Sequence, residues 1–130
     1  METTKLRDLA LLASKNAYSP YSKAQVGCSL ETSDGSIYTG CNIENASYGG
    51  TICAERVAIL KAVSEKKMKL SKIYVYSKDG WPPCGMCRQV MSEFAADDLE
   101  VIIGNQAGHE TKMKFSDLMP LSFTPDHLVP

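Results

Sequence analysis

The spacing of hydrophobic residues along the chain predicts four helices. An apolar stripe runs along Thr4–Tyr18, and Pro20 follows it and keeps the preceding residue out of the α conformation. In a second predicted helix, Cys53–Glu65, apolar residues lie on most sides, so we expect this helix to be buried. A third helix is predicted over Cys84–Ala95, and Ser116 is expected to cap a short last helix that runs through Leu118.

Five stretches have the composition and length of β-strands. They are Val26–Thr32, Ser36–Ile43, Lys72–Ser77, Leu99–Ile103 and Lys112–Phe115. Asp34-Gly35 joins the first two, and this pair is typical of hairpin turns because glycine accepts a positive φ. The link between the last two runs through the seven residues Gly104–Glu110, which can close an antiparallel hairpin but are too few for a parallel crossover.

The order of these elements predicts an α/β fold. Helices that alternate with strands indicate a three-layer αβα sandwich, with a five-stranded mixed sheet whose last two strands are antiparallel. The 130 residues fit one domain, and no linker or repeat divides residues 1–130. A hydrophobic content of 44% supplies enough apolar surface to exclude a disordered chain.

The charge balance limits the partners that this chain is expected to bind. Lysine and arginine number 14 against 15 acidic residues, which gives a formal charge of −1 and a pI near 6.1. Such a balance offers no basic surface for nucleic acid or an anionic membrane. There is also no membrane-length apolar run and no secretion signal, so we expect a cytoplasmic protein.

Three of the five cysteines indicate a metal site. An odd number of cysteines without a secretion signal favours metal binding or catalysis over a disulfide framework. Cys53 and the pair Cys84 and Cys87 lie where two helices are expected to begin, and the free N–H groups of a helix start stabilise a thiolate. Zinc accepts sulfur ligands, and three protein ligands leave its fourth position open for a water that is acidic near neutral pH.

Two further residues of the second helix extend this metal hypothesis. Glu55 lies on the first turn, close enough to Cys53 to carry a proton between water and a substrate nitrogen. Arg56 is expected to donate to the cysteine sulfurs and to offset the net negative charge that three thiolates leave on a divalent zinc.

Two simpler interpretations of these cysteines stay open. The Cys84-x-x-Cys87 spacing is also that of a redox pair, and three cysteines could belong to a structural zinc site of a small interaction module. A structural site needs four ligands, however, and His109 and His127 lie late in the chain without paired spacing. Cys28 and Cys41 lie in apolar strands and are expected to be core residues.

Three separated motifs of the chain resemble those of the small, homotetrameric cytidine deaminases. They are Gly40-Cys41-Asn42-Ile43-Glu44-Asn45-Ala46, Cys53-Ala54-Glu55-Arg56 and Pro83-Cys84-Gly85-Met86-Cys87-Arg88-Gln89. The two cysteine motifs match the H-x-E and P-C-x-x-C pattern of the zinc deaminases, with Cys53 in place of the histidine. The resemblance implies the deaminase fold, a homotetramer, and one zinc ion per subunit bound by Cys53, Cys84 and Cys87.

The resemblance also implies roles for the remaining candidate residues. Glu55 would shuttle protons, with Arg56 behind the metal ligands. The nucleoside would be held by Asn42 and Glu44 at the ribose, and by Ala54, Ala24, Tyr48 and Phe123 around it, partly across a subunit boundary. Here Ala24 stands where the family has a phenylalanine beside the pyrimidine, and we hypothesise that Trp81 fills the vacated space.

The implied activity is zinc-dependent hydrolytic deamination of cytidine and 2′-deoxycytidine to the uridine nucleosides, with release of ammonia, in pyrimidine salvage. Family members that act on polynucleotides place a helix between the last strands, and the short link from Ile103 to Lys112 leaves no room for one. A free nucleoside is therefore the expected substrate. Because of Ala24, an alternative stays open: the same chemistry on a modified cytosine nucleoside or a nucleoside-like antibiotic.

Overall fold

The computed structural model describes residues 2–128, so Met1, Val129 and Pro130 of the expected domain lie outside the described residues. Five strands form one mixed sheet in the order β2-β1-β3-β4-β5. The strands are β1 (Gly27–Thr32), β2 (Ile37–Cys41), β3 (Leu70–Tyr76), β4 (Ala95–Gly104) and β5 (Glu110–Lys114). Only the β3–β4 pair is parallel, so the predicted mixed sheet with an antiparallel last pair is confirmed.

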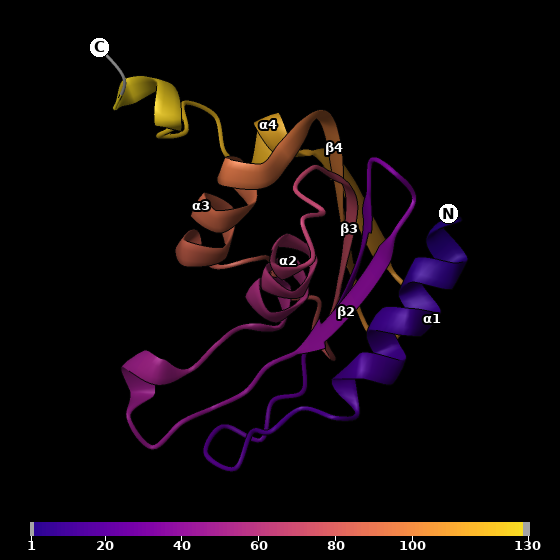
Figure 1. The fold of residues 1–130 in the computed structure, drawn as a ribbon. Coiled ribbons are helices and arrows are strands. Elements are labelled where there is room, and N and C mark those ends of the chain that lie inside the picture. The colour runs from indigo at the N-terminus through magenta and orange to yellow at the C-terminus, as the bar shows by residue number, and fades with distance from the viewer. Residues whose placement is uncertain (1, 129–130) are drawn as a thin grey trace.

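The helices cover both faces of this sheet, which confirms the predicted three layers (Figure 1). Helix α1 (Thr3–Ser14) packs on one face, while α2 (Ala54–Ser64) and α3 (Gly85–Phe94) cover the other. A short α4 (Phe115–Leu118) follows β5, and two 3₁₀ helices, η1 (Tyr48–Gly50) and η2 (Pro125–His127), lie in loops that the sequence did not predict as helical. None of the helices within residues 2–128 has the length and hydropathy needed to cross a membrane.

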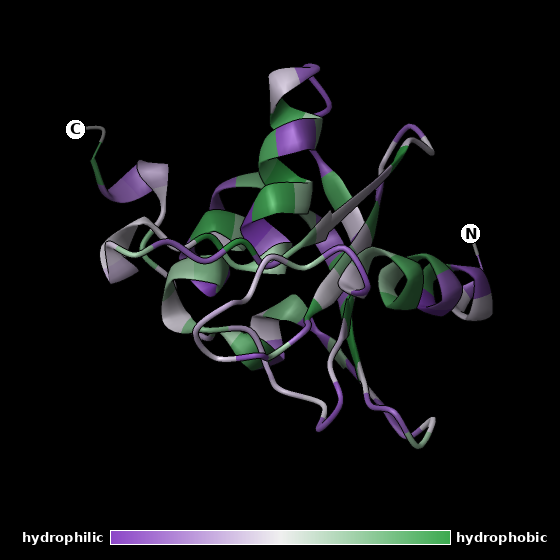
Figure 2. Ribbon diagram, turned by 90° about the horizontal axis from the view of Figure 1, so that it is seen from below, coloured by the Kyte–Doolittle hydropathy of each residue, from purple (hydrophilic) through white to green (hydrophobic). Residues whose placement is uncertain are grey.

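Alternating side chains of the central strands build the core on both sides of the sheet. Ile73 and Val75 point to the α2–α3 side, whereas Tyr74 and Ile102 pack under α1. Figure 2 shows hydrophobic residues gathered where helices meet the sheet, with more polar residues along the peripheral loops. Cys28 is fully buried in the larger cluster, as expected, and Cys41 is half-buried.

Several predicted boundaries differ from the structure, including those of α1, β4 and α4. Helix α1 ends at Ser14 rather than Tyr18, because Tyr18 instead pairs in extended conformation with Ile43. Strand β4 begins directly after α3, four residues before the predicted start, and this additional part includes the exposed Asp97 and Asp98. The cap of α4 is Lys114 and not Ser116, since Phe115 already turns into the core and is 8% exposed.

Candidate active site

The three cysteines predicted as metal ligands meet at the starts of α2 and α3. Cys53 and Cys84 are the N-cap residues of the two helices, and Cys87 lies in the first turn of α3. Their sulfur atoms all lie within 4.8 Å of one another. Two distances are 3.8 Å, from Cys53 Sγ to Cys84 Sγ, and 3.5 Å, from Cys84 Sγ to Cys87 Sγ.

Local sequence explains why both helices begin at these cysteines. Before α2, Ile52 exchanges two backbone hydrogen bonds of 2.9 Å with Ile43, so the chain is extended up to Cys53. Before α3, Pro82 and Pro83 exclude a helix, and Arg88 fixes the turn because its Nε donates to the Pro83 carbonyl over 2.8 Å. The helices can therefore start only where the thiols are.

The sulfur arrangement fits a zinc ion. A tetrahedral zinc with bonds of about 2.3 Å to sulfur needs its sulfurs about 3.8 Å apart, which agrees with the two distances above. Hydrogen bonds from the Cys87 thiol and the Arg56 guanidinium lower the pKa of Cys53 to about 5, although partial burial acts against them. Three convergent sulfurs, one of them with a lowered pKa, are a donor set that zinc prefers.

Arg56 lies against the cysteine cluster. Its Nη2 donates to Cys53 Sγ at 3.6 Å and to the Thr51 carbonyl at 3.5 Å. Its Nε is buried and has no hydrogen-bond partner within residues 2–128. An unpartnered guanidinium N–H beside the thiols is suited to offset the negative charge of additional thiolates.

Glu55 is the buried acid of the site. Its side chain is only 4% exposed, and burial raises the pKa of its carboxyl to about 7, with a further increase from the negative charge on Cys53. A carboxyl with a pKa near 7 can both accept and return a proton near neutral pH. The structure thus places a carboxyl that is suited to proton transfer two residues from Cys53.

A cavity of about 210 Å³ opens beside Glu55 and two of the sulfurs. Seven predicted site residues line it: Ala24, Asn42, Glu44, Cys53, Ala54, Glu55 and Cys84. Its remaining walls include Ser22, Val26, Thr51 and Val75, to which the sequence interpretation gave no role. Only Ser22 had a signal in the sequence, because it lies two residues before Ala24, which the resemblance places beside the base.

Asn42 and Glu44 hold the loop that forms one wall of this cavity. Asn42 Nδ2 donates to the Ala24 carbonyl, and Asn42 Oδ1 accepts from the Val26 amide, both over 2.9 Å. Glu44 accepts from the backbone amide and the hydroxyl of Ser22, which lowers the pKa of its carboxyl. Both side chains therefore fix the wall and also face the cavity.

Tyr48 and Phe123 lie outside the cavity of the single chain. Tyr48 is 75% exposed on η1, and Phe123 is 53% exposed, with its ring stacked on His127. Figure 1 shows that the loop around residue 48 and the segment after α4 both project from the body of the molecule.

Comparisons with known proteins agree with this geometry. Residues 1–103 match the family model described as the cytidine and deoxycytidylate deaminase zinc-binding region. The cytidine deaminase of Halalkalibacterium halodurans is 46% identical over 121 residues, 92% of each chain, and that of Sporosarcina psychrophila is 40% identical over 98% of this chain and 96% of its own.

Solved structures give the same result. The crystal structure of cytidine deaminase from Burkholderia pseudomallei superposes with a TM-score of 0.90 at 39% identity, over 95% of this chain and all of that one. Cytidine deaminase from Mycobacterium tuberculosis has a TM-score of 0.82 at 34% identity, over 95% of this chain and 98% of its own.

Proposed function

The chain belongs to the cytidine and deoxycytidylate deaminase family, and from this premise we propose that it deaminates cytidine and 2′-deoxycytidine to uridine and 2′-deoxyuridine. The observation that carries the proposal is the cluster of three cysteine sulfurs next to the buried carboxyl of Glu55, at one small cavity. The reaction is a hydrolysis: water adds to C4 of the pyrimidine, and the amino group leaves as ammonia.

Cys53, Cys84 and Cys87 would hold one zinc ion per subunit, and Arg56 would stabilise the thiolate charge. When bound, such an ion supplies a nucleophilic water near neutral pH. The remaining chemistry belongs to Glu55. Its carboxylate accepts a proton from the attacking water and gives it to N3. It then accepts the remaining proton from the hydroxyl added at C4 and transfers it to the departing amine, so that the C4 carbonyl forms and ammonia leaves.

The nucleoside would be positioned by the walls of the 210 Å³ cavity. Asn42 keeps one amide N–H and Glu44 keeps carboxylate lone pairs beyond the bonds that hold the 21–26 loop, and these would bind the ribose hydroxyls. Ala54 and Ala24 would contact the base. Tyr48 and Phe123 would enclose the nucleoside of a neighbouring subunit, which accounts for their exposure in one chain.

We further propose a homotetramer that works in cytoplasmic pyrimidine salvage. Helix α2 supports the assembly, because Leu60 remains 48% exposed on a helix whose other side is buried at Ala54, Ala58, Ile59 and Ala62. The free state of the cysteines is the one expected in a reducing compartment. A formal charge of −1 favours a free nucleoside over nucleic acid.

One purified sample tests the function. We expect one zinc ion per chain, and one ammonia released for each uridine formed from cytidine. Glu55→Gln should retain the zinc and lose at least about 100-fold in kcat, because its amide cannot carry protons. Cys87→Ser should lose both metal and activity, whereas Cys41→Ser, outside the site, should keep both. An active metal-free chain or an active Glu55→Gln variant would contradict the proposal.

A further inference from the structure

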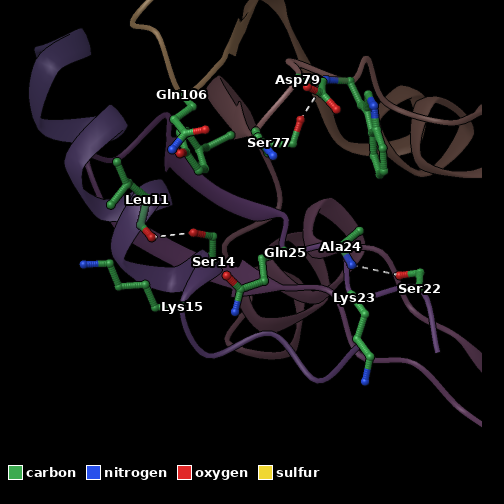
Figure 3. Close-up of a pocket in the computed structure, with 13 residues that line it drawn as sticks. Leu11, Ser14, Lys15, Ser22, Lys23, Ala24, Gln25, Ser77, Asp79 and Gln106 are labelled. Carbon is green, nitrogen blue, oxygen red and sulfur yellow. Dashed lines mark hydrogen bonds between the residues drawn. The ribbon is translucent and has the colours of Figure 1, made fainter. Parts of the chain in front are cut away.

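A second and larger cavity adjoins the one at the cysteines. It has a volume of about 520 Å³, within the range of small-molecule sites, and lies between the end of α1, the 22–25 loop, the end of β3 and the loop after β4. We call it the side cavity and define it by Ser14, Gln25, Ser77 and Gln106 (Figure 3). The site already described does not use it.

The two cavities share three wall residues: Ser22, Ala24 and Trp81. The cavities therefore meet at this edge. Trp81 is 51% exposed and lines both, so its indole lies at this edge together with Ala24. Ala24 contributes only a methyl group to the edge, and we take this edge as the opening between the two cavities.

Hydrogen bonds fix both sides of this opening. The Ala24 carbonyl accepts from Asn42 Nδ2 over 2.9 Å, and its amide donates to Ser22 Oγ over 3.1 Å. On the other side, the Trp81 amide donates to Ser77 Oγ over 2.7 Å, and Ser77 is 3% exposed. Since the backbone is held, the side chains at positions 24 and 81 set the width of the opening.

The lining of the side cavity indicates the chemistry of what enters it. The amides of Gln25 and Gln106 and the hydroxyl of Ser22 offer uncharged donors and acceptors. Figure 3 shows the ends of the Lys15 and Lys23 side chains extending away from the other labelled residues. The two other charged residues of the lining, Lys78 and Asp79, carry opposite charges. The side cavity thus suits an uncharged polar group rather than an anion.

The proposed function decides which part of a substrate could reach this space. Glu55 and the metal site face N3 and C4 of cytosine, and N1 carries the sugar. A group on C6 would collide with the ribose, so C5 is the position from which a substituent can leave the base-binding cavity. We propose that this site takes cytosine nucleosides with an uncharged polar C5 substituent longer than methyl, and that Ala24 is the residue that admits them.

The test compares cytidine, 5-(3-hydroxypropyl)cytidine and 5-(2-carboxyethyl)cytidine by ammonia release. We expect kcat/KM for the hydroxypropyl nucleoside within about tenfold of cytidine, and the carboxyethyl nucleoside to be slower. Ala24→Phe should lower the ratio of hydroxypropyl to cytidine kcat/KM at least tenfold, whereas the matched variant Ala24→Ser should leave this ratio unchanged. Gln106→Ala, remote from the sulfurs, should reduce only the hydroxypropyl reaction.

Binding gives a readout independent of turnover. Trp81 is the single tryptophan of the chain, so its fluorescence reports on a ligand at the opening. We expect 5-(3-hydroxypropyl)uridine to change the emission more than uridine does, and Ala24→Phe to weaken its binding.

Different outcomes would overturn this inference and the proposed function. Rejection of the hydroxypropyl nucleoside, an unchanged ratio in Ala24→Phe, or preference for the carboxylate overturns this inference while cytidine is still deaminated. A chain that releases no ammonia from cytidine overturns the proposed function itself.

Discussion

At the scale of single residues, Asn42 and Glu44 stabilise the loop at residues 21–26 by hydrogen bonds that need no ligand. Asn42 is 9% exposed and bridges Ala24 and Val26, while Glu44 accepts bonds from Tyr21 and Ser22. Five or so residues without regular structure are thereby held against the cavity. Loss of either side chain should therefore loosen a wall as well as remove a ribose contact.

Asn42→Asp tests the hydrogen bonds of Asn42 without changing the size of its side chain. The aspartate still accepts from the Val26 amide but places an oxygen against the Ala24 carbonyl, which leaves a buried acceptor unpaired. We expect a loss of about 1–3 kcal/mol in the free energy of unfolding, measured in urea. Asn45→Asp is the matched control: Asn45 is exposed and its Oδ1 accepts from the Ser47 amide, as an aspartate would. Equal stability of the two variants would refute the bridging role.

The sequence was sufficient to group the cysteine trio with Glu55, because these residues lie in local motifs at helix starts and the structure brings them together. It was not sufficient for Val26, Thr51 and Val75, which line the cavity only because the sheet and α2 meet there. Nothing in the residue type of a strand valine distinguishes a cavity wall from the core.

At the scale of elements, Gly40 on β2 sets how closely α2 approaches the sheet. A Cβ at this position would lie 2.6 Å from both the Ala54 carbonyl oxygen and the Ala58 amide nitrogen, which are helix backbone and cannot rotate away. Because Ala54 directly follows Cys53, the same contact fixes the distance between the cysteine cluster and the sheet.

Gly40→Ala should therefore displace the start of α2. We expect the free energy of unfolding to fall by about 1–3 kcal/mol, together with weaker zinc retention. Chemical denaturation and metal analysis of the same samples measure both effects. Gly49→Ala is the control, since nothing lies within 4 Å of a Cβ added there. A Gly40→Ala chain that is as stable and as metal-rich as the control would show that α2 adapts freely.

The order and type of the main elements could be predicted because periodicity and turn residues are local signals. The hairpin at Gly35, for example, has the positive φ of 87° that the Asp-Gly pair indicates. The predicted boundaries are wrong where contacts between residues distant in the sequence determine the local structure. Tyr18 would continue α1 by propensity alone, but its amide donates to the Asn42 carbonyl over 3.0 Å, and this tertiary pairing ends the helix region early.

At the scale of the whole molecule, the proposed tetramer predicts an asymmetry between the two exposed leucines of the main helices. Leu60 lies on α2 and Leu12 on α1, on opposite sides of the sheet, and they are 48% and 60% exposed. We expect Leu60→Arg to dissociate the assembly and reduce activity, because Tyr48 and Phe123 would no longer complete a neighbouring site. Leu12→Arg should change neither, as followed by sedimentation velocity. Dissociation by both variants or by neither would contradict an interface at α2.

A polar network joins the α1 face of the sheet to the far edge. Arg7 Nη1 donates to the Tyr74 hydroxyl over 2.9 Å, and that hydroxyl donates to Glu110 Oε2 over 2.5 Å. Arg7 Nη2 also donates to the Asn105 carbonyl over 2.9 Å. The network thus connects α1, β3, β5 and the loop between the last two strands.

Because of this network, we expect the free energy of unfolding to fall at alkaline pH. Burial, and then the hydrogen bond to Glu110, raise the pKa of Tyr74 from 10 to about 12. The folded state thus favours the neutral phenol, so the contribution is complete below pH 10 and is lost as the pH rises through 12. Two pKa units correspond to about 2–3 kcal/mol in the free energy of unfolding, because the side chain is fully buried.

Urea unfolding between pH 9 and 12 should show this loss of stability. Tyr74→Phe should make the free energy of unfolding less dependent on pH in this range, whereas Tyr18→Phe, at a residue 56% exposed, should not. An equally steep loss in Tyr74→Phe would assign the alkaline sensitivity to other groups and leave the network as a purely mechanical connection between α1 and β5.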